Sequence, residues 1–286
     1  MTSLTWIITG ASRGFGRAIA EHALVRGDNV VAAVRRPEAV ADLADHHPDR
    51  FASVHFDAHE RGTVDDVVST TLSRFGRVDA LVNNAGRGIV GAAEEIGDAD
   101  LRASLELHLL VPAALVRAVL PTMRAHGSGT IVQMSSQGGR LSFPGVGAYS
   151  AGKFAIEGWS EALAGEVAPF GIRVMIVEPS RFRTAFNQPD VLSVARPSPV
   201  YREVLDAVRA DMASADGRQE GDPAKAAELI VTLVHGDDVP LRLPLGAEAV
   251  ERLGKSYRTS LEGLQRWTEA ARGTDFEGIA PSSRPV

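Results

Sequence analysis

A glycine-rich turn between a strand and a helix, close to the N-terminus, is the feature that most constrains the fold. Residues 4–9 are a short apolar run with β-branched and aromatic side chains, which is typical of a buried parallel strand. The turn GASRGFG follows at residues 10–16, then a helix-like stretch at 17–26 and a second strand at 29–34. Glycines here permit a tight turn and let backbone N–H groups at the helix N-terminus approach a pyrophosphate closely. The spacing G-x-x-x-G-x-G differs from the usual G-x-G-x-x-G, but its place between strand and helix favours a dinucleotide site over a plain connection.

The rest of the chain repeats this alternation of short apolar strands and helical patterns. Strands are predicted at residues 4–9, 29–34, 51–56, 79–82, 129–135, 172–178 and near 241–244. Alternation of this kind indicates a parallel sheet with helices on both faces. No Ser/Gly-rich linker and no internal repeat divides the 286 residues. We therefore expect one domain, residues 1–286, with an α/β fold: a Rossmann-like, doubly wound parallel sheet of about seven strands in a three-layer α/β/α arrangement.

Composition argues against several classes of protein. The chain has no cysteine, so it forms no disulfides, and its net charge of −6 argues against a nucleic-acid-binding surface. No apolar run reaches the ~18–20 residues that cross a bilayer, and no basic-then-apolar leader precedes the first strand. Apart from His108, the histidines lack carboxylate or cysteine partners at metal-ligand spacing. We expect a cytoplasmic enzyme with no membrane, nucleic-acid or metal partner.

Tyr149 and Lys153 form the most informative pair of side chains. Residues four apart on a helix project from the same face, one turn separated. A free tyrosine titrates near pKa ~10, and an ammonium beside it favours the phenolate and lowers that pKa toward the working range. Ser136, thirteen positions before the tyrosine, could hold a carbonyl oxygen against the phenol, and Ser135 is a competing candidate. Alone the pair is a weak signal, but with a serine it predicts proton transfer between a ketone and an alcohol.

Four motifs in a fixed order make the chain similar to the short-chain dehydrogenase/reductase family, single-domain branch. They are TGASRGFG at residues 9–16, NNAG at 83–86, Ser136 with YSAGK at 149–153, and EPS at 178–180 followed by Thr184. They resemble the family's cofactor turn, its N-N-A-G motif, its catalytic serine with Y-x-x-x-K, and its P-G-x-x-x-T segment. The thirteen-residue spacing to the tyrosine points to Ser136 rather than Ser135.

The resemblance implies a hydride-transfer enzyme. Hydride would pass between a nicotinamide and a ketone or secondary alcohol, with Tyr149 as general acid/base, Ser136 polarising the carbonyl, and Lys153 lowering the tyrosine pKa and binding the ribose. The family often adds an asparagine on the long helix before the fifth strand, where it helps a water chain carry protons to the lysine. His108 stands at the matching position. It either hydrogen-bonds a water and shuttles protons, or is a satisfied helix residue with no catalytic role.

The end of the second strand decides which nicotinamide cofactor is preferred. In NAD sites an acid there accepts hydrogen bonds from the adenosine ribose, whereas a 2′-phosphate favours arginine. Val34 occupies the place of the acid, Arg35 follows, and Arg13 lies inside the glycine turn. Guanidinium groups suit a phosphate dianion, so we expect NADP(H) to be preferred over NAD(H). The alternative is that Arg13, Arg35 and Arg36 are solvated surface charges.

The resemblance carries over the rest of the cofactor shell by position. Asp57 matches the acid that contacts the adenine amino group, although a turn cap explains it nearly as well. Ser180 stands where glycine is usual, and a positive φ there would add strain of ~1 kcal/mol. The expected cofactor-binding residues are Gly10, Ser12, Arg13, Gly14, Phe15, Gly16, Arg35, Asp57, Asn83, Ala85, Gly86, Tyr149, Lys153, Pro179, Phe182 and Thr184.

A long segment after the last motif, at about residues 183–221, is rich in Pro and Ala and interrupted by charge, as expected of a substrate-covering lid. Phe143, Phe182 and Phe186 suggest a largely apolar substrate pocket, although packing of the lid on the body would explain them too. The expected substrate is a hydrophobic carbonyl or alcohol, such as an aromatic ketone, a steroid-like or polyketide carbonyl, or an acyl thioester.

The chain continues well past the last predicted strand. Apolar residues there recur at roughly helical spacing: Val250, Leu253, Tyr257, Leu261, Leu264 and Trp267. A helical extension is therefore expected at about 246–275, although Gly254 and Gly263 argue against it. It would cover either the pocket or the surface that many relatives use to build a tetramer, leaving a dimer through the long helices at 100–126 and 147–169. We expect a homodimer or a homotetramer.

Two other functions stay open from the sequence. The chain could be a non-catalytic regulator that senses NADP(H), or a sugar-nucleotide epimerase or dehydratase of the same superfamily. Loss of the tyrosine or the lysine would mark a regulator, and neither is lost. The epimerases and dehydratases carry a differently spaced glycine turn and usually a larger C-terminal domain.

Overall fold

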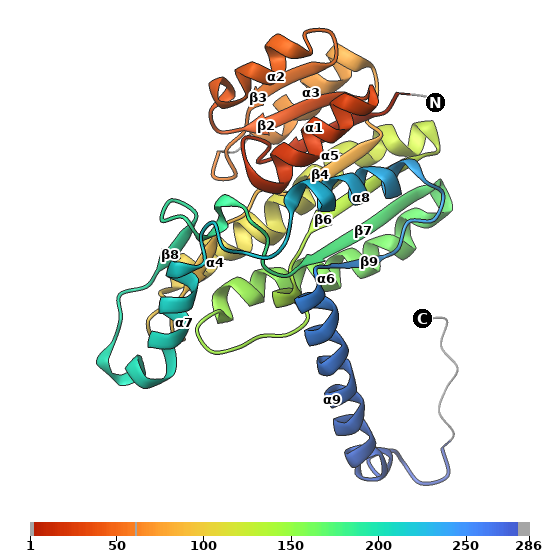
Figure 1. Cartoon of the computed structure of the whole chain (residues 1–286). Coiled ribbons are helices and arrows are strands. Elements are labelled where there is room, and N and C mark those ends of the chain that lie inside the picture. Colours follow the sequence, from red (N-terminus) through yellow and green to blue (C-terminus); the bar gives the residue numbers. More distant parts are fainter. Residues whose placement is uncertain (1–2, 61, 280–286) are drawn as a thin grey trace.

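Seven parallel strands form the central sheet of the computed structural model, which describes residues 3–60 and 62–279 (Figure 1). The strands are β1 (Thr5–Thr9), β2 (Asn29–Val34), β3 (Phe51–His55), β4 (Ala80–Asn83), β6 (Gly129–Met134), β7 (Ile172–Pro179) and β9 (Arg242–Leu245). Their spatial order is β3-β2-β1-β4-β6-β7-β9. The chain therefore starts in the middle of the sheet and winds outward in both directions, which confirms the doubly wound fold.

Helices cover both faces of this sheet. The α-helices of the described residues are α1 (Gly14–Arg26), α2 (Ala41–His46), α3 (Thr63–Phe75), α4 (Asp98–Leu105), α5 (Val111–His126), α6 (Gly147–Val167), α7 (Arg202–Ser214), α8 (Pro223–His235) and α9 (Ala247–Arg272), of which α7 and α9 lie outside the layers (Figure 1). Successive residues of β1 point to opposite faces: Trp6 and Ile8 pack with α1 and α8, whereas Ile7 packs with α3, α5 and α6. Two apolar cores result, one on each side of the sheet, as expected of a three-layer structure.

Residues 98–126 form one long helical stretch in which a π-helical turn, Glu106–Leu110, separates α4 from α5. This stretch is long and apolar enough by composition to cross a bilayer, which corrects the expectation that no segment reaches that length. Buried helices of globular proteins meet the same criterion, and Leu115, Val116 and Val119 of α5 belong to the core. The absence of a membrane partner therefore stays a prediction.

A second, two-stranded parallel sheet was not predicted. It pairs β5 (Gly88–Val90) with β8 (Leu192–Val194). The segment after β4 is therefore hydrogen-bonded to the lid segment that contains β8. Arg209 of α7, which is also part of the lid, forms an ion pair with Glu95, whose side chain is buried. The lid is therefore a packed element, while the strands of three residues are too short to show an alternating pattern.

The helical extension is confirmed as α9, and Gly254 and Gly263 do not interrupt it. Figure 1 shows α9 leaving the body near the end of β9 and extending away from it. Only its first two turns are packed, because Ala249 and Leu253 are its buried residues.

Candidate active site

A cavity of about 850 Å³ lies at the carboxyl ends of the central strands. Its walls come from the glycine turn after β1, the ends of β2, β4, β6 and β7, the first turns of α6, and the lid helix α7. Loops at this edge of a doubly wound sheet form the usual ligand crevice.

The glycine turn forms the cradle of the cavity. Gly10 and Gly14 have φ angles of 66° and 58°, which residues with a side chain rarely adopt. Helix α1 begins there with no side-chain cap and no acidic residue in its first turn. Its first N–H groups are therefore available to an anion such as a pyrophosphate. Gly16 does not line the cavity. A Cβ on Gly16 would be 2.5 Å from Asn84 Nδ2, so the glycine permits the turn to pack closely on the end of β4.

Asn83 is a correction to the expected cofactor shell. Its side chain turns into the sheet, where Nδ2 donates a hydrogen bond to Gln133 Oε1 at 3.0 Å, and it does not line the cavity. The neighbouring Asn84 lines it instead and ties β4 to the glycine turn, with Nδ2 donating to the carbonyl of Thr9 at 2.9 Å. Ala85 and Gly86 line the cavity as expected.

Arg13 and Arg35 both reach the adenosine end of the cavity. Arg13 ion-pairs with Asp190 of the lid at 2.6 Å, a partner that the sequence did not suggest. Within residues 3–60 and 62–279, Arg35 makes no ion pair. Asp57 lines the cavity too, and its Oδ1 accepts a hydrogen bond from the His59 backbone at 2.9 Å. Asp57 therefore caps a turn, which still leaves its second oxygen for a ligand.

The segment after β7 forms the wall of the cavity where the resemblance places the nicotinamide. Pro179, Phe182 and Thr184 line the cavity, and the Phe182 ring lies 5.0 Å from that of Phe15. Ser180 carries no strain, because no described residue other than glycine has a positive φ. Its hydroxyl donates to the carbonyl of Leu245 at 3.2 Å.

Ser136, Tyr149 and Lys153 meet on the floor of the cavity. Ser136 follows β6, and its Oγ accepts a hydrogen bond from Gly138 N at 3.0 Å while its side chain also hydrogen-bonds Tyr149. Lys153 lies one turn after Tyr149 on α6, with Nζ donating to the carbonyl of Met134 at 2.7 Å. Ser135 is buried outside the lining, so Ser136 is the serine that faces the tyrosine.

Burial shifts the two titrating groups of this floor in opposite directions. Loss of water raises the pKa of Tyr149 to about 12, and the hydrogen bond with Ser136 opposes this only in part. Burial lowers the pKa of Lys153 to about 8, against the attraction of Glu157. We expected Lys153 to lower the tyrosine pKa. Its Nζ instead points to the Met134 carbonyl, 5.7 Å from the centre of the tyrosine ring.

His108 lies beside this floor, in the π-helical turn. Its ring meets the Tyr149 ring edge-on at 5.5 Å. Two glycines leave space for the His108 side chain. A Cβ on Gly86 would lie 3.1 Å from His108 Cε1, and a Cβ on Gly152 would lie 2.9 Å from His108 Cβ. Nε2 contacts the Arg87 carbonyl at 3.0 Å, and Nδ1 is buried without a partner among the described residues.

The surroundings of His108 disfavour protonation of its ring. Burial, and then the nearby Lys153 charge, hold its pKa well below the ordinary value. Nε2 must therefore carry the hydrogen that is donated to the Arg87 carbonyl, which leaves Nδ1 as a free acceptor.

The substrate half of the cavity is largely apolar. Phe143 and Phe186 line it, and the Phe186 ring lies 5.7 Å from that of Tyr149. Helix α7 adds side chains that the sequence analysis missed, namely Val204, Val208 and Met212. Their spacing of four along the lid is a helical signal that could have identified them.

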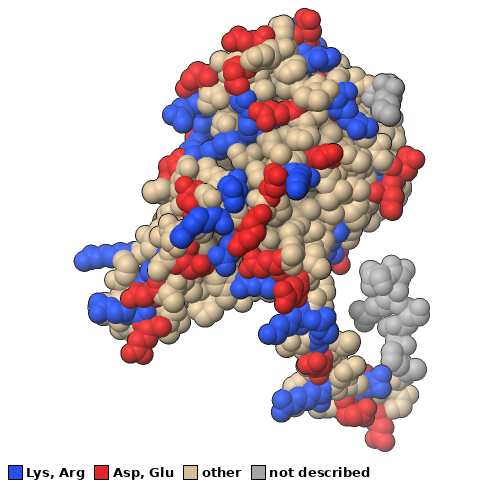
Figure 2. All heavy atoms as spheres, in the orientation of Figure 1, with Lys and Arg blue, Asp and Glu red and all other residues tan. Residues whose placement is uncertain are grey.

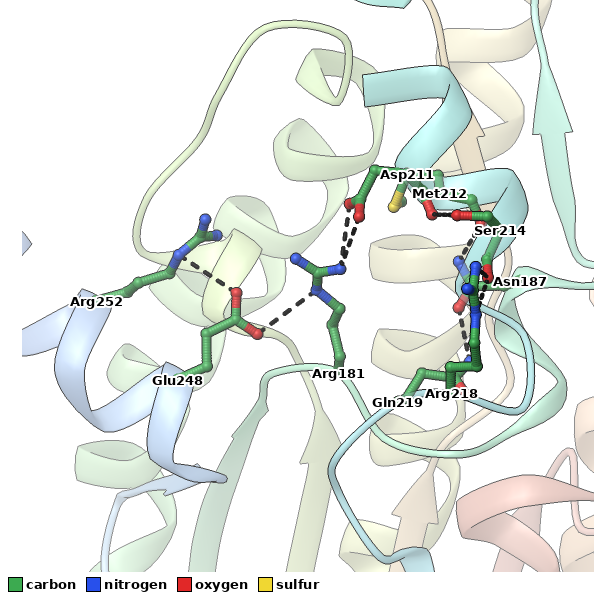
Figure 3. A network of polar contacts seen from close by, with 9 residues as sticks. All are labelled: Arg181, Asn187, Asp211, Met212, Ser214, Arg218, Gln219, Glu248 and Arg252. Atoms are coloured by element: carbon green, nitrogen blue, oxygen red, sulfur yellow. Dashed lines mark hydrogen bonds and ion pairs between the residues drawn. The ribbon is translucent and has the colours of Figure 1, made fainter. Parts of the chain in front are cut away.

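Charged side chains from three distant segments form the outer rim. Figure 3 shows Arg181, just after β7, between Asp211 of α7 and Glu248 of α9, at 3.1 Å and 3.7 Å. Arg252 of α9 pairs with Glu248 at 3.3 Å and lies over the Phe143 ring. The extension thus contributes to the pocket rim, which agrees with one of the two places that the sequence analysis left open for it.

No group of His, Asp and Glu residues suited to a metal ion occurs in the part of the chain that is described. The expectation that catalysis needs no metal stays a prediction.

Comparison with known proteins places these features in a family. The chain matches the model for short chain dehydrogenases over residues 5–193. It is 37% identical over 267 residues to an oxidoreductase of Botryotinia fuckeliana, covering 92% of this chain and 96% of that one. The crystal structure of a short-chain dehydrogenase from Streptomyces avermitilis is similar with a TM-score of 0.91 and 47% identity, over 96% of this chain and all of the other.

A more distant solved structure carries a cofactor. It is a 3-ketoacyl-(acyl-carrier-protein) reductase from Brucella melitensis complexed with NADH, with a TM-score of 0.70 and 25% identity over 85% of this chain and 96% of the reductase. The family match spans more than half of the present chain, from β1 through β8. The chain is thus an oxidoreductase with a Rossmann-like nucleotide-binding fold, and it belongs to the short-chain dehydrogenase/reductase family.

Proposed function

We propose that the protein interconverts a hydrophobic ketone and its secondary alcohol with NADP(H) as the preferred cofactor. The observation that carries this proposal is the meeting of Ser136, Tyr149 and Lys153 in the lining of one cavity. When bound, the nicotinamide dinucleotide supplies or accepts the hydride. The uncapped N-terminus of α1 would hold its pyrophosphate, and Lys153 would bind the nicotinamide ribose.

Tyr149 serves as the acid in the direction of reduction. With a pKa of about 12 its phenol stays protonated at neutral pH, so a proton is available for the alkoxide that forms on the substrate. The Ser136 hydroxyl donates a hydrogen bond to the same oxygen and stabilises its developing charge. Lys153, with a pKa of about 8, is still mostly an ammonium at neutral pH. After Tyr149 has given up its proton, the Lys153 ammonium can supply a new proton to the phenolate.

His108 supports this proton path as an acceptor. Its free Nδ1 lies in a buried region near Lys153, and a neutral imidazole there can hold a water molecule in line with the lysine. Because protonation of the buried ring is unfavourable, His108 positions the water rather than carrying the proton as an imidazolium. This is the role that the sequence comparison assigned to asparagine.

The preference for NADP(H) rests on two guanidinium groups. Arg35 and Arg13 both line the end of the cavity where the adenosine ribose would lie, and Val34 replaces the acid of an NAD site. A 2′-phosphate there would compete with Asp190 for Arg13. The substrate class rests on the phenylalanines and on the apolar face of α7. A ketone or 3-ketoacyl group on a long apolar substituent would fill that half.

The proposal is tested by following NADPH oxidation with a panel of hydrophobic ketones, with NADH as the comparison. We expect ketone-dependent oxidation that is faster with NADPH. Tyr149→Phe should lower turnover by roughly 10²–10⁴-fold, because the general acid is lost, while NADPH binding measured by calorimetry is retained. Tyr201→Phe is the matched control, since this lid tyrosine lies outside the cavity lining. Equal turnover in both variants would remove Tyr149 from catalysis.

A further inference from the structure

Helix α9 exposes an apolar stripe beyond the point where it leaves the body (Figure 1). The exposed fractions are 61% for Val250, 53% for Leu261, 67% for Leu264 and 63% for Trp267. Tyr257, between them, is 44% exposed, and the Arg140 guanidinium of the body lies over its ring. Contiguous apolar surface of this kind marks an interaction site.

The stripe continues the face that anchors α9. Leu253 is 1% exposed because it packs on the body. Tyr257 follows it four residues later, and Leu264 follows Tyr257 after another seven. Val250, Tyr257 and Leu264 are seven residues apart, with Leu261 filling the turn between. A heptad spacing of this type aligns apolar side chains for packing against another helix. The body covers the start of the face, and nothing in residues 3–60 and 62–279 covers the rest.

A helix in this position is costly for a single chain. In proteins, packing of an apolar face supplies most helix stability, and the large apolar residues of α9 after Leu253 are exposed. Gly254 and Gly263 lower the helix stability further, by roughly 1 kcal/mol each. Around Gly263 a Cβ would meet no atom within 4 Å, so no contact within the described chain accounts for its small size.

The charges on α9 favour a protein partner of the same composition. The stripe itself is uncharged, and the remaining surface of α9 carries charges of both signs (Figure 2). The charged residues after Val250 are Glu251, Arg252, Lys255, Arg258, Glu262, Arg266, Glu269 and Arg272. An anionic membrane or a nucleic acid would favour a basic face. Mixed signs suit a second helix with the same pattern.

We propose that α9 is a pairing arm, which packs along its apolar stripe against α9 of a second copy of this chain. The pairing is antiparallel, about a two-fold axis near Ser260 and Leu261. Tyr257 then comes level with Leu264 of the second copy, and Val250 with Ala271. A parallel pair would bring both bodies to the same end of helices that pack 8–10 Å apart. The antiparallel pair places the bodies at opposite ends, where they do not collide.

The arm is fixed to the pocket rim at its base. Glu248 pairs with Arg181, which also holds Asp211 of the lid helix (Figure 3). Pairing would therefore hold Glu248 and Arg252 in place at the cavity mouth. The surfaces of the long helices α4–α5 and α6 are not used by this arm and stay available for a further contact.

Sedimentation equilibrium of the full chain tests the pairing. The wild type should form dimers or larger even-numbered assemblies, and Leu264→Glu should halve the mass of the particle. Thr259→Glu is the matched control, because Thr259 is exposed on the opposite side of α9 and should keep the wild-type mass. A wild type that sediments as a single chain overturns the proposal, whether α9 then binds vesicles of anionic lipid or another protein. Unchanged mass in Leu264→Glu overturns it as well.

Cross-linking tests the geometry without disturbing the stripe. Because the chain has no cysteine, single cysteines can be placed freely. Ser260→Cys lies beside the two-fold axis and should form a disulfide-linked dimer on mild oxidation, since disulfides need Cα atoms about 4.4–6.8 Å apart. Ala271→Cys lies far from its own copy in the antiparallel pair and should not. Cross-linking of Ala271→Cys, or of neither variant, contradicts the antiparallel arm.

Discussion

The residues on the cavity floor share one environment and respond to it differently. Burial raises the pKa of the Tyr149 phenol to about 12 and lowers the pKa of the Lys153 ammonium to about 8. At neutral pH the pair is therefore a phenol beside an ammonium, which is the state needed for donating a proton to an alkoxide. His108 adds a neutral acceptor next to both. These protonation preferences support the proposed reduction near neutral pH.

Replacing His108 tests whether its free nitrogen matters. His108→Ala should lower kcat by roughly tenfold or more with little effect on KM, because the proton path is impaired while the pocket is retained. His108→Asn, which keeps an acceptor, should recover much of the loss. Since the pKa of His108 lies well below its ordinary value, the wild-type rate should show no titration of this ring near neutral pH. Equal kcat for the Ala and Asn variants would show that His108 is only a packing residue.

Reversing the charge of Arg35 tests the cofactor preference. Arg35→Asp should lower the NADPH/NADH ratio of kcat/KM by roughly ten- to a hundredfold, because a charge-assisted hydrogen bond to the 2′-phosphate is worth about 1.5–3 kcal/mol. The measurement is the rate with each cofactor on one ketone. Arg74→Asp is the control, since Arg74 lies on α3 away from the cavity. An NADPH/NADH ratio of kcat/KM that stays at the wild-type value would show that Arg35 does not contact the 2′-phosphate.

The order of the elements could be predicted from the sequence, and some residue placements could not. The seven strands follow from apolar runs that are separated by turns and helices. Asn83 was misplaced because adjacent residues in a strand face opposite sides, and only the register of β4 against β6 decides which asparagine turns inward. The Arg13–Asp190 pair was missed because its two residues are far apart in the chain. Such contacts depend on how the lid folds back, which periodicity does not encode.

At the scale of elements, α6, β7 and β9 meet at a buried cluster of charges behind Lys153. Glu157 of α6 and Glu178 of β7 both approach the Arg242 guanidinium of β9, at 3.2 Å and 3.6 Å. Burial, and then repulsion by Glu157, raise the pKa of Glu178 to about 7. One arginine therefore joins the last two strands to the helix that carries the catalytic pair.

Glu178 should make stability fall with rising pH. Its folded-state pKa of about 7 lies above the ordinary value of 4.5, so the folded state favours the neutral acid. Its contribution to the unfolding free energy is complete below about pH 4.5 and is lost as pH rises through about 7. Thermal unfolding followed from pH 5 to 8 should show a smaller decline for Glu178→Gln than for the wild type.

Glu161→Gln is the control for this cluster. Glu161 pairs with the same arginine at 2.8 Å, but its pKa is lowered by that pairing. Removing Glu161 should leave the wild-type decline between pH 5 and 8 in place. Parallel melting curves for wild type and Glu178→Gln would show that Glu178 is already ionised when the protein folds.

At the scale of the whole molecule, one cavity is assembled from the core sheet, a lid and an extension. The sheet supplies the cofactor turn and the catalytic floor, the lid supplies α7, and the base of α9 supplies Glu248 and Arg252. The sequence predicted a lid and a terminal helix by composition and helical spacing. How they meet at Arg181 could not be predicted, because that contact depends on three segments arriving together.

Two residues of the rim, Asp211 and Glu248, come late in the chain. The family match ends at residue 193, and every group proposed to move a hydride or a proton lies before that point. Asp211 and Glu248 come after it, yet both reach the mouth of the cavity. Substitutions at these rim residues can therefore alter which molecules enter the cavity while Ser136, Tyr149 and Lys153 stay unchanged.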